Sequence, residues 1–266
     1  FMQKIINSHC HIYPEKIASK AVCGIKDFYD LDMSLNGTVS GLIEDGKKVG
    51  VTHYLVHSVA TTPKQVKSIN EFIGESVKAN SDIFTGFGTL HPDSEDIQGD
   101  FDHLIELGLK GVKVHPDFQQ FAMNGKRAFK MGEIINEGNV PLMVHCGDFR
   151  YSYSTPEHIK PFLEKFPDIT FIGAHFAGWS IWNEATEQLA GIPNLYVDLS
   201  SSLYDLTSEN ALELIHAYGA DKVLWGTDYP MWESKSEMEY FNKLDLTKKE
   251  RSQILYENAA KILGLK

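Results

Sequence analysis

Two histidines near the start of the chain flank a cysteine in the stretch NSHCHIYP, residues 7–14. If this stretch ends a strand, His9 and His11 point to one face and Cys10 to the other, because side chains alternate along a strand. Two imidazoles on one face can bind a single metal ion. Cys10 is then expected to face the surrounding helices as a small buried hydrophobe.

Other histidines recur at the carboxyl ends of expected strands. Seven of the eleven in the chain lie at or just past such an end: His9, His11, His57, His91, His115, His145 and His175. Asp228 holds the same place after the last expected strand, in VLWGTDYP. In a barrel of parallel strands these ends meet on one face, where the active site is built. A single histidine there would more often be structural, but the recurrence predicts a functional site.

The strands that would position these residues are short apolar runs. Eight are expected, over residues 4–8, 53–59, 83–90, 111–115, 141–145, 169–175, 195–199 and 223–226. Several are continuously apolar, as buried parallel strands are. Segments of helical period separate them, over residues 40–49, 63–79, 95–107, 127–136, 156–166, 181–189 and 208–218, with a helical tail from 233.

This alternation predicts an α/β fold, a single (β/α)8 TIM barrel over residues 2–266, and the chain length suits one. A doubly wound open sheet is the alternative, but the Gly-rich phosphate turn typical of that fold is absent from the early strands. Residues 12–37 have no clear period and are expected to form an irregular loop inserted over the barrel mouth. Phe1, ahead of Met2, is expected to be a cloning remnant.

Composition narrows the function classes. The formal net charge of −11 disfavours nucleic acid or an anionic membrane as partner and leaves a small-molecule substrate. No apolar run approaches the 18 or so residues of a membrane span. Three cysteines without framework spacing predict a reduced, cytoplasmic protein.

The motifs around these positions resemble those of a known superfamily. His-x-His on the first expected strand, PLMVHCGD on the fifth, FIGAHFAG on the sixth and VLWGTDYP on the eighth resemble the amidohydrolase superfamily. They are most similar to its amidohydrolase-related branch, which includes aminocarboxymuconate-semialdehyde decarboxylase. The similarity extends to GVKVHPDFQQF and ILYENAAKILGL, and so over the whole chain. It implies that His9, His11, His145 and Asp228 hold a metal ion, and that His175 contacts the water or the substrate.

The implied chemistry is that of a metal-assisted enzyme. A divalent ion can lower the pKa of bound water to about 7, and Asp228 could take the released proton while His175 orients the water or protonates the leaving group. Imidazole and carboxylate suit zinc, the default expectation, but also manganese, iron or nickel. Binuclear relatives carry a carboxylated lysine on the fourth strand. Lys113 and His115 share a face there, and their KVHP pattern fits the single-metal branch better, so one metal is expected, with both as pocket residues.

Arg150 is one of only three arginines and follows the fifth expected strand. Its guanidinium could bind a substrate carboxylate in two places at once. Equally, it could pair with Asp148 or Glu157. Tyr151 and Trp179 could form an aromatic wall around a ring substrate, or could serve only in packing.

The leading hypothesis is a metal-dependent hydrolase acting on an amide, ester or lactone of a small, carboxylated compound. The alternative is non-oxidative decarboxylation of an aromatic or enoic acid, which would use the same ligands. A catalytically idle binding protein would have lost a ligand position, and all five are filled. Because relatives are often dimers or larger, a homo-oligomer is expected by analogy.

Overall fold

The strands of the computed structural model, which describes residues 3–265, are all parallel. Phe1, Met2 and Lys266 lie outside the described residues, and with them the expected cloning remnant and the outer bounds of the expected domain. The strands are β1 (Ile6–His11), β2 (His53–His57), β3 (Phe84–Gly86), β4 (Gly88–Thr89), β5 (Val112–Val114), β6 (Leu142–Val144), β7 (Phe171–Gly173), β8 (Leu195–Asp198) and β9 (Val223–Leu224).

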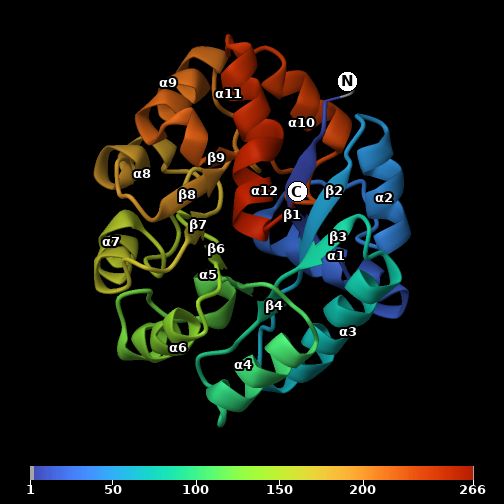
Figure 1. The fold of residues 1–266 in the computed structure, drawn as a ribbon, viewed down its shortest axis with the longest axis vertical. Coiled ribbons are helices and arrows are strands. Elements are labelled where there is room, and N and C mark those ends of the chain that lie inside the picture. The colour runs from blue at the N-terminus through green and yellow to red at the C-terminus, as the bar shows by residue number, and fades with distance from the viewer. Residues whose placement is uncertain (1–2, 266) are drawn as a thin grey trace.

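These strands close into a barrel. The orders β1-β2-β3 and β4 to β9 follow the sequence. The strand expected over 83–90 bends between β3 and β4, where Phe87 N donates to Val56 O at 3.0 Å. The ring closes between its first and last strands, because Ser8 N donates to Trp225 O at 3.0 Å. The expected (β/α)8 barrel is therefore confirmed, with its helices in an outer ring (Figure 1).

The helices fall close to their expected positions, with two additions. They are α1 (Glu15–Tyr29), α2 (Val39–Lys47), α3 (Val66–Ala79), α4 (Ile97–Glu106), α5 (Pro116–Gln119), α6 (Lys126–Glu137), α7 (Pro156–Lys165), α8 (Trp182–Leu189), α9 (Ser208–Tyr218), α10 (Ser234–Phe241), α11 (Lys248–Ser252) and α12 (Asn258–Leu263). Only α1 and the short α5 were not expected. Among residues 3–265, no helix has the length and apolar character that crossing a membrane would require.

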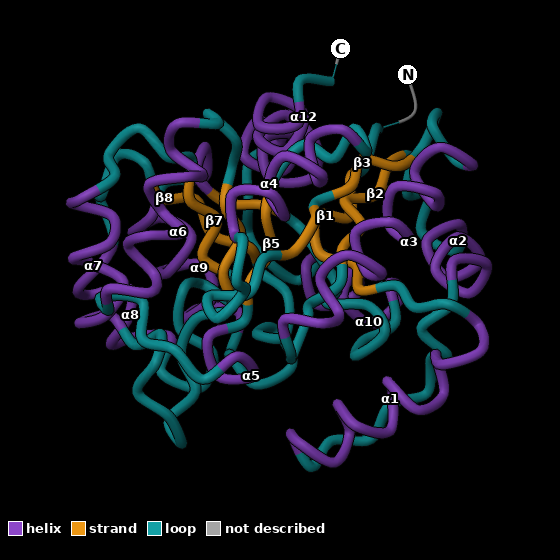
Figure 2. Tube along the Cα trace, turned by 90° about the horizontal axis from the view of Figure 1, so that it is seen from below, coloured by secondary structure: helices purple, strands orange, loops and turns teal. Residues whose placement is uncertain are grey.

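The irregular loop expected over residues 12–37 is wrong for most of its length, because α1 occupies 15–29. Ile17, Ala21, Ile25 and Phe28 recur at helical spacing, which favours a helix with one apolar face. Gly24 interrupts this pattern and no side chain caps the first turn, so the helical signal is weak. Figure 2 shows α1 and α5 on one side of the barrel and α12 on the opposite side.

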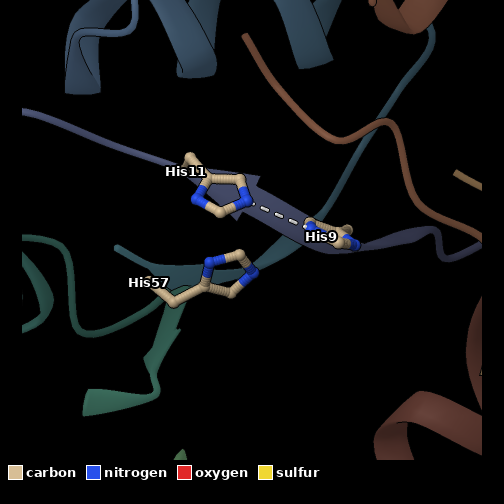
Figure 3. A group of neighbouring side chains, drawn as sticks. All are labelled: His9, His11 and His57. Atoms are coloured by element: carbon tan, nitrogen blue, oxygen red, sulfur yellow. Dashed lines mark hydrogen bonds between the residues drawn. The ribbon is translucent and has the colours of Figure 1, made fainter. Parts of the chain in front are cut away.

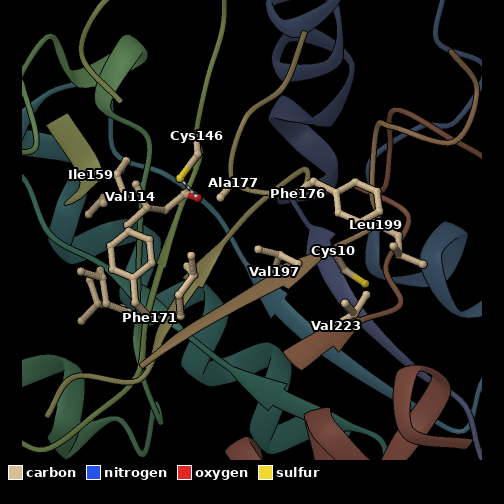
Figure 4. Close-up of a cluster of buried hydrophobic side chains, with 14 of the residues drawn as sticks. Cys10, Val114, Cys146, Ile159, Phe171, Phe176, Ala177, Val197, Leu199 and Val223 are labelled. Atoms are coloured by element: carbon tan, nitrogen blue, oxygen red, sulfur yellow. Dashed lines mark hydrogen bonds between the residues drawn. The ribbon is translucent and has the colours of Figure 1, made fainter. Parts of the chain in front are cut away.

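Two apolar layers hold the strands. Inside the barrel, seven side chains from different strands, or from the bend between β3 and β4, form one cluster: Ile6, Leu55, Phe87, Met143, Ile172, Tyr196 and Leu224. Ala259 and Ala260 of α12 belong to the same cluster, so α12 packs against this inner layer. The second, larger cluster lies between strands and helices and includes Cys10, close to Val197, Leu199 and Val223 (Figure 4). Cys10 therefore faces the helix layer, as expected, and His9 and His11 face the other way.

Candidate active site

Three donor atoms converge at the carboxyl ends of the first and last strands. The Nε2 atoms of His9 and His11 are 3.2 Å apart, and Asp228 Oδ1 lies 3.1 Å from the first and 3.3 Å from the second. The segment after β9 is paired with β1, since His11 N donates to Tyr229 O at 2.7 Å. In addition, Asn7 Nδ2 donates to Thr227 Oγ1 at 2.8 Å. This pairing fixes Asp228 beside the two histidines.

The protonation of His9 suits a metal ligand. Its Nδ1 lies 2.9 Å from Asp198 Oδ2, and because a carboxylate only accepts, Nδ1 carries the proton. Burial alone would raise the pKa of Asp198, but the adjacent His9 holds that pKa at about 2. Burial and Lys113 lower the pKa of His9, yet Asp228 and Asp198 outweigh them and raise it. The surroundings of His9 Nε2 therefore favour a positive charge there.

The donor set fits a divalent transition metal. Donors bound to one ion at about 2.0–2.2 Å lie roughly 3.0–3.6 Å apart, as these three do. Burial lowers the pKa of His11 to about 4, so its nitrogen is unprotonated at neutral pH. Burial would raise the pKa of Asp228, but His9 and His11 hold it well below its ordinary value. Two imidazoles and an ionised carboxylate thus make a donor set for a cation, which would displace the proton that the surroundings of His9 favour.

His57, at the end of β2, offers a further donor that sequence reasoning did not include in the site. Its ring lies 4.5 Å from the ring of His11 and 5.0 Å from that of His9, centroid to centroid (Figure 3). His57 is fully buried, and neither of its ring nitrogens has a hydrogen-bond partner. Burial, with the neighbouring histidines, lowers its pKa well below the ordinary value. The only sequence signal was its position at a strand end, which His91 shares.

His145 and His175 form a pair beside the donors. His145 Nδ1 lies 3.1 Å from His175 Nε2, and His175 Nε2 lies 4.0 Å from Asp228 Oδ2. Among the described residues, His175 groups with His9 and Asp228 as possible ligands, whereas His145 groups with His115 and Asp117. Ligation by His145 therefore stays a prediction from the resemblance.

Both expected catalytic residues have left-handed backbones, His175 at φ 60° and Asp228 at φ 55°. Such conformations persist at functional sites where the surroundings hold them. His175 Nδ1 donates to Ser200 O at 2.9 Å, which leaves its Nε2 unprotonated and directed at the site. Burial lowers the pKa of His175, so the ring is neutral. Ser201 Oγ donates to Asp228 Oδ2 at 2.7 Å.

Of the two expected pocket residues, Lys113 lies on β5 and His115 directly follows it. The side chain of Lys113 is fully buried, with Nζ 3.5 Å from His9 Nε2, and burial lowers its pKa. The His115 ring stacks on His145 at 3.9 Å, and its Nε2 lies 2.9 Å from the Tyr29 hydroxyl of α1. Asp117 lies beside them with neither oxygen hydrogen-bonded, and burial raises its pKa to about 8.

Arg150 is not among the residues that line the cavity, and it makes the pairing with Asp148 that was the second of its two expected roles. Its Nε and Nη2 donate to the two oxygens of Asp148 at 2.9 and 2.7 Å, and Nη1 donates to Phe28 O of α1 at 2.7 Å. Tyr151 and Trp179 also do not line the cavity. They pack on α1, Tyr151 on Phe28 at 5.7 Å and Trp179 on Tyr29 at 5.1 Å. All three side chains therefore contact α1. The sequence analysis did not expect this helix and so could not predict these contacts.

A cavity of about 720 Å³ opens above the donors. His9, His11, His145, His175 and Asp228 all line it, as does His115. The remaining lining comes from the segments after β1 and β9, from α1, from the β2–α3 connection, from α3, and from Phe118 of α5. The arrangement is a pocket with metal donors and proton acceptors beside a largely apolar wall.

A sequence profile of the family described as Amidohydrolase matches residues 7–265. The chain belongs to the amidohydrolase family. The resemblance noted in the motifs is thereby confirmed for the superfamily. No curated protein matches the chain in sequence.

Solved structures share the barrel over nearly the whole chain. A TIM-barrel protein from Bordetella bronchiseptica superposes with a TM-score of 0.83 at 20% identity, covering 98% of each chain. A dihydroxybenzoic acid decarboxylase from Polaromonas, solved with manganese and 2-nitroresorcinol, gives 0.75 at 16% identity, covering 99% of this chain and 97% of that one. A probable 2-pyrone-4,6-dicarboxylic acid hydrolase from Acinetobacter baumannii gives 0.70 at 16% identity, covering 98% and 99%. At these identities the likeness concerns the fold.

Proposed function

We propose that this amidohydrolase is a metal-dependent hydrolase that cleaves an amide, ester or lactone. The observation that carries the proposal is the convergence of His9 Nε2, His11 Nε2 and Asp228 Oδ1 within 3.3 Å of one another beside a substrate-sized cavity. A divalent ion bound there, zinc for preference, would lower the pKa of bound water to about 7 and polarise a substrate carbonyl.

The chain's own residues supply the proton transfers. Asp228 is ionised and approaches His9 and His11 with its Oδ1, so its Oδ2 can accept the proton of the attacking water. His175 Nε2 is unprotonated and lies 4.0 Å from that oxygen, which lets it take up the proton and return it to the leaving group. Asp198 holds the His9 ring in the tautomer that a metal ligand needs.

The cavity supports hydrolysis over decarboxylation. Lys20 is the only lysine or arginine among the described residues that line it, and the Arg150 guanidinium is paired with Asp148. A substrate carboxylate would thus have Lys20, an exposed side chain, as its one lysine or arginine partner in the lining, which favours a substrate without a carboxylate. Decarboxylation remains the second candidate, because several structures with this fold are decarboxylases.

The test sets two assays against each other on the zinc- and manganese-loaded protein. Hydrolysis is followed on neutral esters, lactones and amides, and carbon dioxide release on a panel of hydroxybenzoates. We expect hydrolysis, with activity reduced at least a thousandfold in His9→Ala and Asp228→Asn and retained in the matched control Cys10→Ala. Carbon dioxide release without hydrolysis would favour the decarboxylase. Inactivity in both assays with stoichiometric metal bound would favour an idle binding protein.

A further inference from the structure

Helix α1 carries apolar side chains that the core does not cover. Of its fifteen residues only Ala18 is buried, although the helix has a distinct apolar face. Ile17 is 50% exposed, and Ile25 and Phe28 are partly exposed. All three line the cavity above the donors, so this apolar face is turned to the cavity and not to the barrel.

Helix α3 adds to the same lining. Its Ile69 and Phe72 pack against the outer core and also border the cavity. Apolar side chains of two helices therefore line the same cavity as the metal donors. Soluble proteins seldom leave a contiguous apolar surface open unless a ligand or partner covers it.

Charge and size indicate what covers this surface. Among the described residues that line the cavity there is one lysine or arginine, Lys20, and one carboxyl side chain, Asp228 beside the donors. A volume of about 720 Å³ lies in the range of about 300–1,000 Å³ that encloses drug-sized ligands, and exceeds what one small ring needs. A neutral ligand with a reactive group at the donors and a long apolar portion fits both properties.

We infer that the space between the donors, α1 and α3 is a subsite for an extended apolar acyl group, and that the substrate is an acyl amide or ester. The inference rests on the proposed hydrolase function, since that function places the scissile carbonyl at the donors. The acyl group then lies against Ile25, Phe28 and Phe72. Burial of each added methylene strengthens binding, by roughly fourfold where burial is complete.

Gly24 gives a direct way to fill this subsite. It lies on α1, lines the cavity, and an added Cβ would have no atom within 4 Å. Its φ is not left-handed, so Gly24→Phe is compatible with the helix and removes a residue of low helix propensity. The neighbouring Cys23 is exposed and does not line the cavity, which makes Cys23→Phe a matched control.

The experiment measures binding of straight-chain amides, from butanamide to octanamide, to the zinc-loaded protein by calorimetry. We expect affinity to rise on the order of a hundredfold across the series. In Gly24→Phe the octanamide affinity should fall at least tenfold while butanamide is little affected, and Cys23→Phe should behave as the unmodified protein. Equal affinities along the series, or equal losses in both variants, would overturn the inference.

Comparing binding with hydrolysis shows whether the acyl subsite or the proposed hydrolase function is wrong. Chain-length-dependent binding without hydrolysis of any amide, ester or lactone would keep the subsite and reject the proposed function. Hydrolysis without chain-length dependence would do the reverse. If Gly24→Phe instead changed the oligomeric state while leaving amide binding intact, α1 would be a contact between copies of the chain and the acyl subsite would be wrong.

Discussion

At the scale of the residue, His57 is a buried side chain whose hydrogen-bonding groups lack partners. It is fully buried beside His9 and His11 with both ring nitrogens unbonded, and leaving a buried polar group unpaired costs about 1–3 kcal/mol. A bound cation within reach would satisfy one nitrogen. We therefore expect His57→Leu to weaken zinc affinity at least tenfold, as measured by chelator competition, and to alter the visible spectrum of the cobalt-loaded protein.

His53 provides the control for that prediction, because it lies on the same strand and is also buried, but its Nε2 bonds to Thr85 Oγ1 at 2.8 Å. His53→Leu should leave zinc affinity unchanged. His145→Leu belongs in the same series, since the resemblance names it as a ligand. Unaltered affinity in His57→Leu together with a large loss in His145→Leu would show that the ligand set follows the family pattern instead.

Single residues also show which contacts can be predicted from their positions in the sequence. Strand-end position was enough to bring His9, His11 and Asp228 together, because parallel strands deliver their ends to one face. It could not decide whether Arg150 would bind Asp148 or a substrate, nor show that His57 would join His9 and His11 in one group of possible ligands. Those outcomes depend on loop conformation and strand neighbours, which spacing does not encode.

At the scale of the element, apolar runs predicted the strands and α1 was missed. A buried strand must be apolar, so its composition identifies it. Helix α1 buries one residue and turns its apolar face to a cavity, so composition gave little sign of it. The bend between β3 and β4 could not be predicted either, because the two strands belong to one apolar run in the sequence.

Helix α10 contains a buried carboxyl group with a measurable effect on stability. Glu237 is 1% exposed and neither of its oxygens is hydrogen-bonded. Burial raises its pKa well above the ordinary value, and Asp228 and Asp198 add to the rise. The folded protein therefore binds a proton that the unfolded chain releases once the pH exceeds about 4.5, so stability falls as pH rises through that range.

Glu237→Gln removes this titration. We expect the variant to gain free energy of unfolding relative to the unmodified protein between pH 5 and pH 7.5, with a slope of at most about 1.4 kcal/mol per pH unit. Urea unfolding of both proteins with equal zinc loading measures the difference at each pH. Glu239→Gln, on the exposed side of the same helix, should show no such trend. A difference that is constant with pH would mean that Glu237 is ionised in the folded protein.

At the scale of the whole molecule, the metal donors come from the first strand and from the segment after the last one, on the two sides of the seam that closes the barrel. His9 and His11 belong to β1, and Asp228 follows β9, so an ion bound by all three holds the first strand to the last.

An ion present at 100 times its dissociation constant stabilises the folded state by about 2.7 kcal/mol if the unfolded chain does not bind it. For a chain of this size we expect chelation to lower Tm by roughly 5–10 °C while far-ultraviolet circular dichroism at 25 °C stays unchanged, because two apolar layers hold the strands without the ion. Calorimetry before chelation, after it and after zinc is restored measures the shift, with His9→Ala as the variant that should show none. An equal shift in His9→Ala would place the stabilising ion somewhere other than the barrel seam.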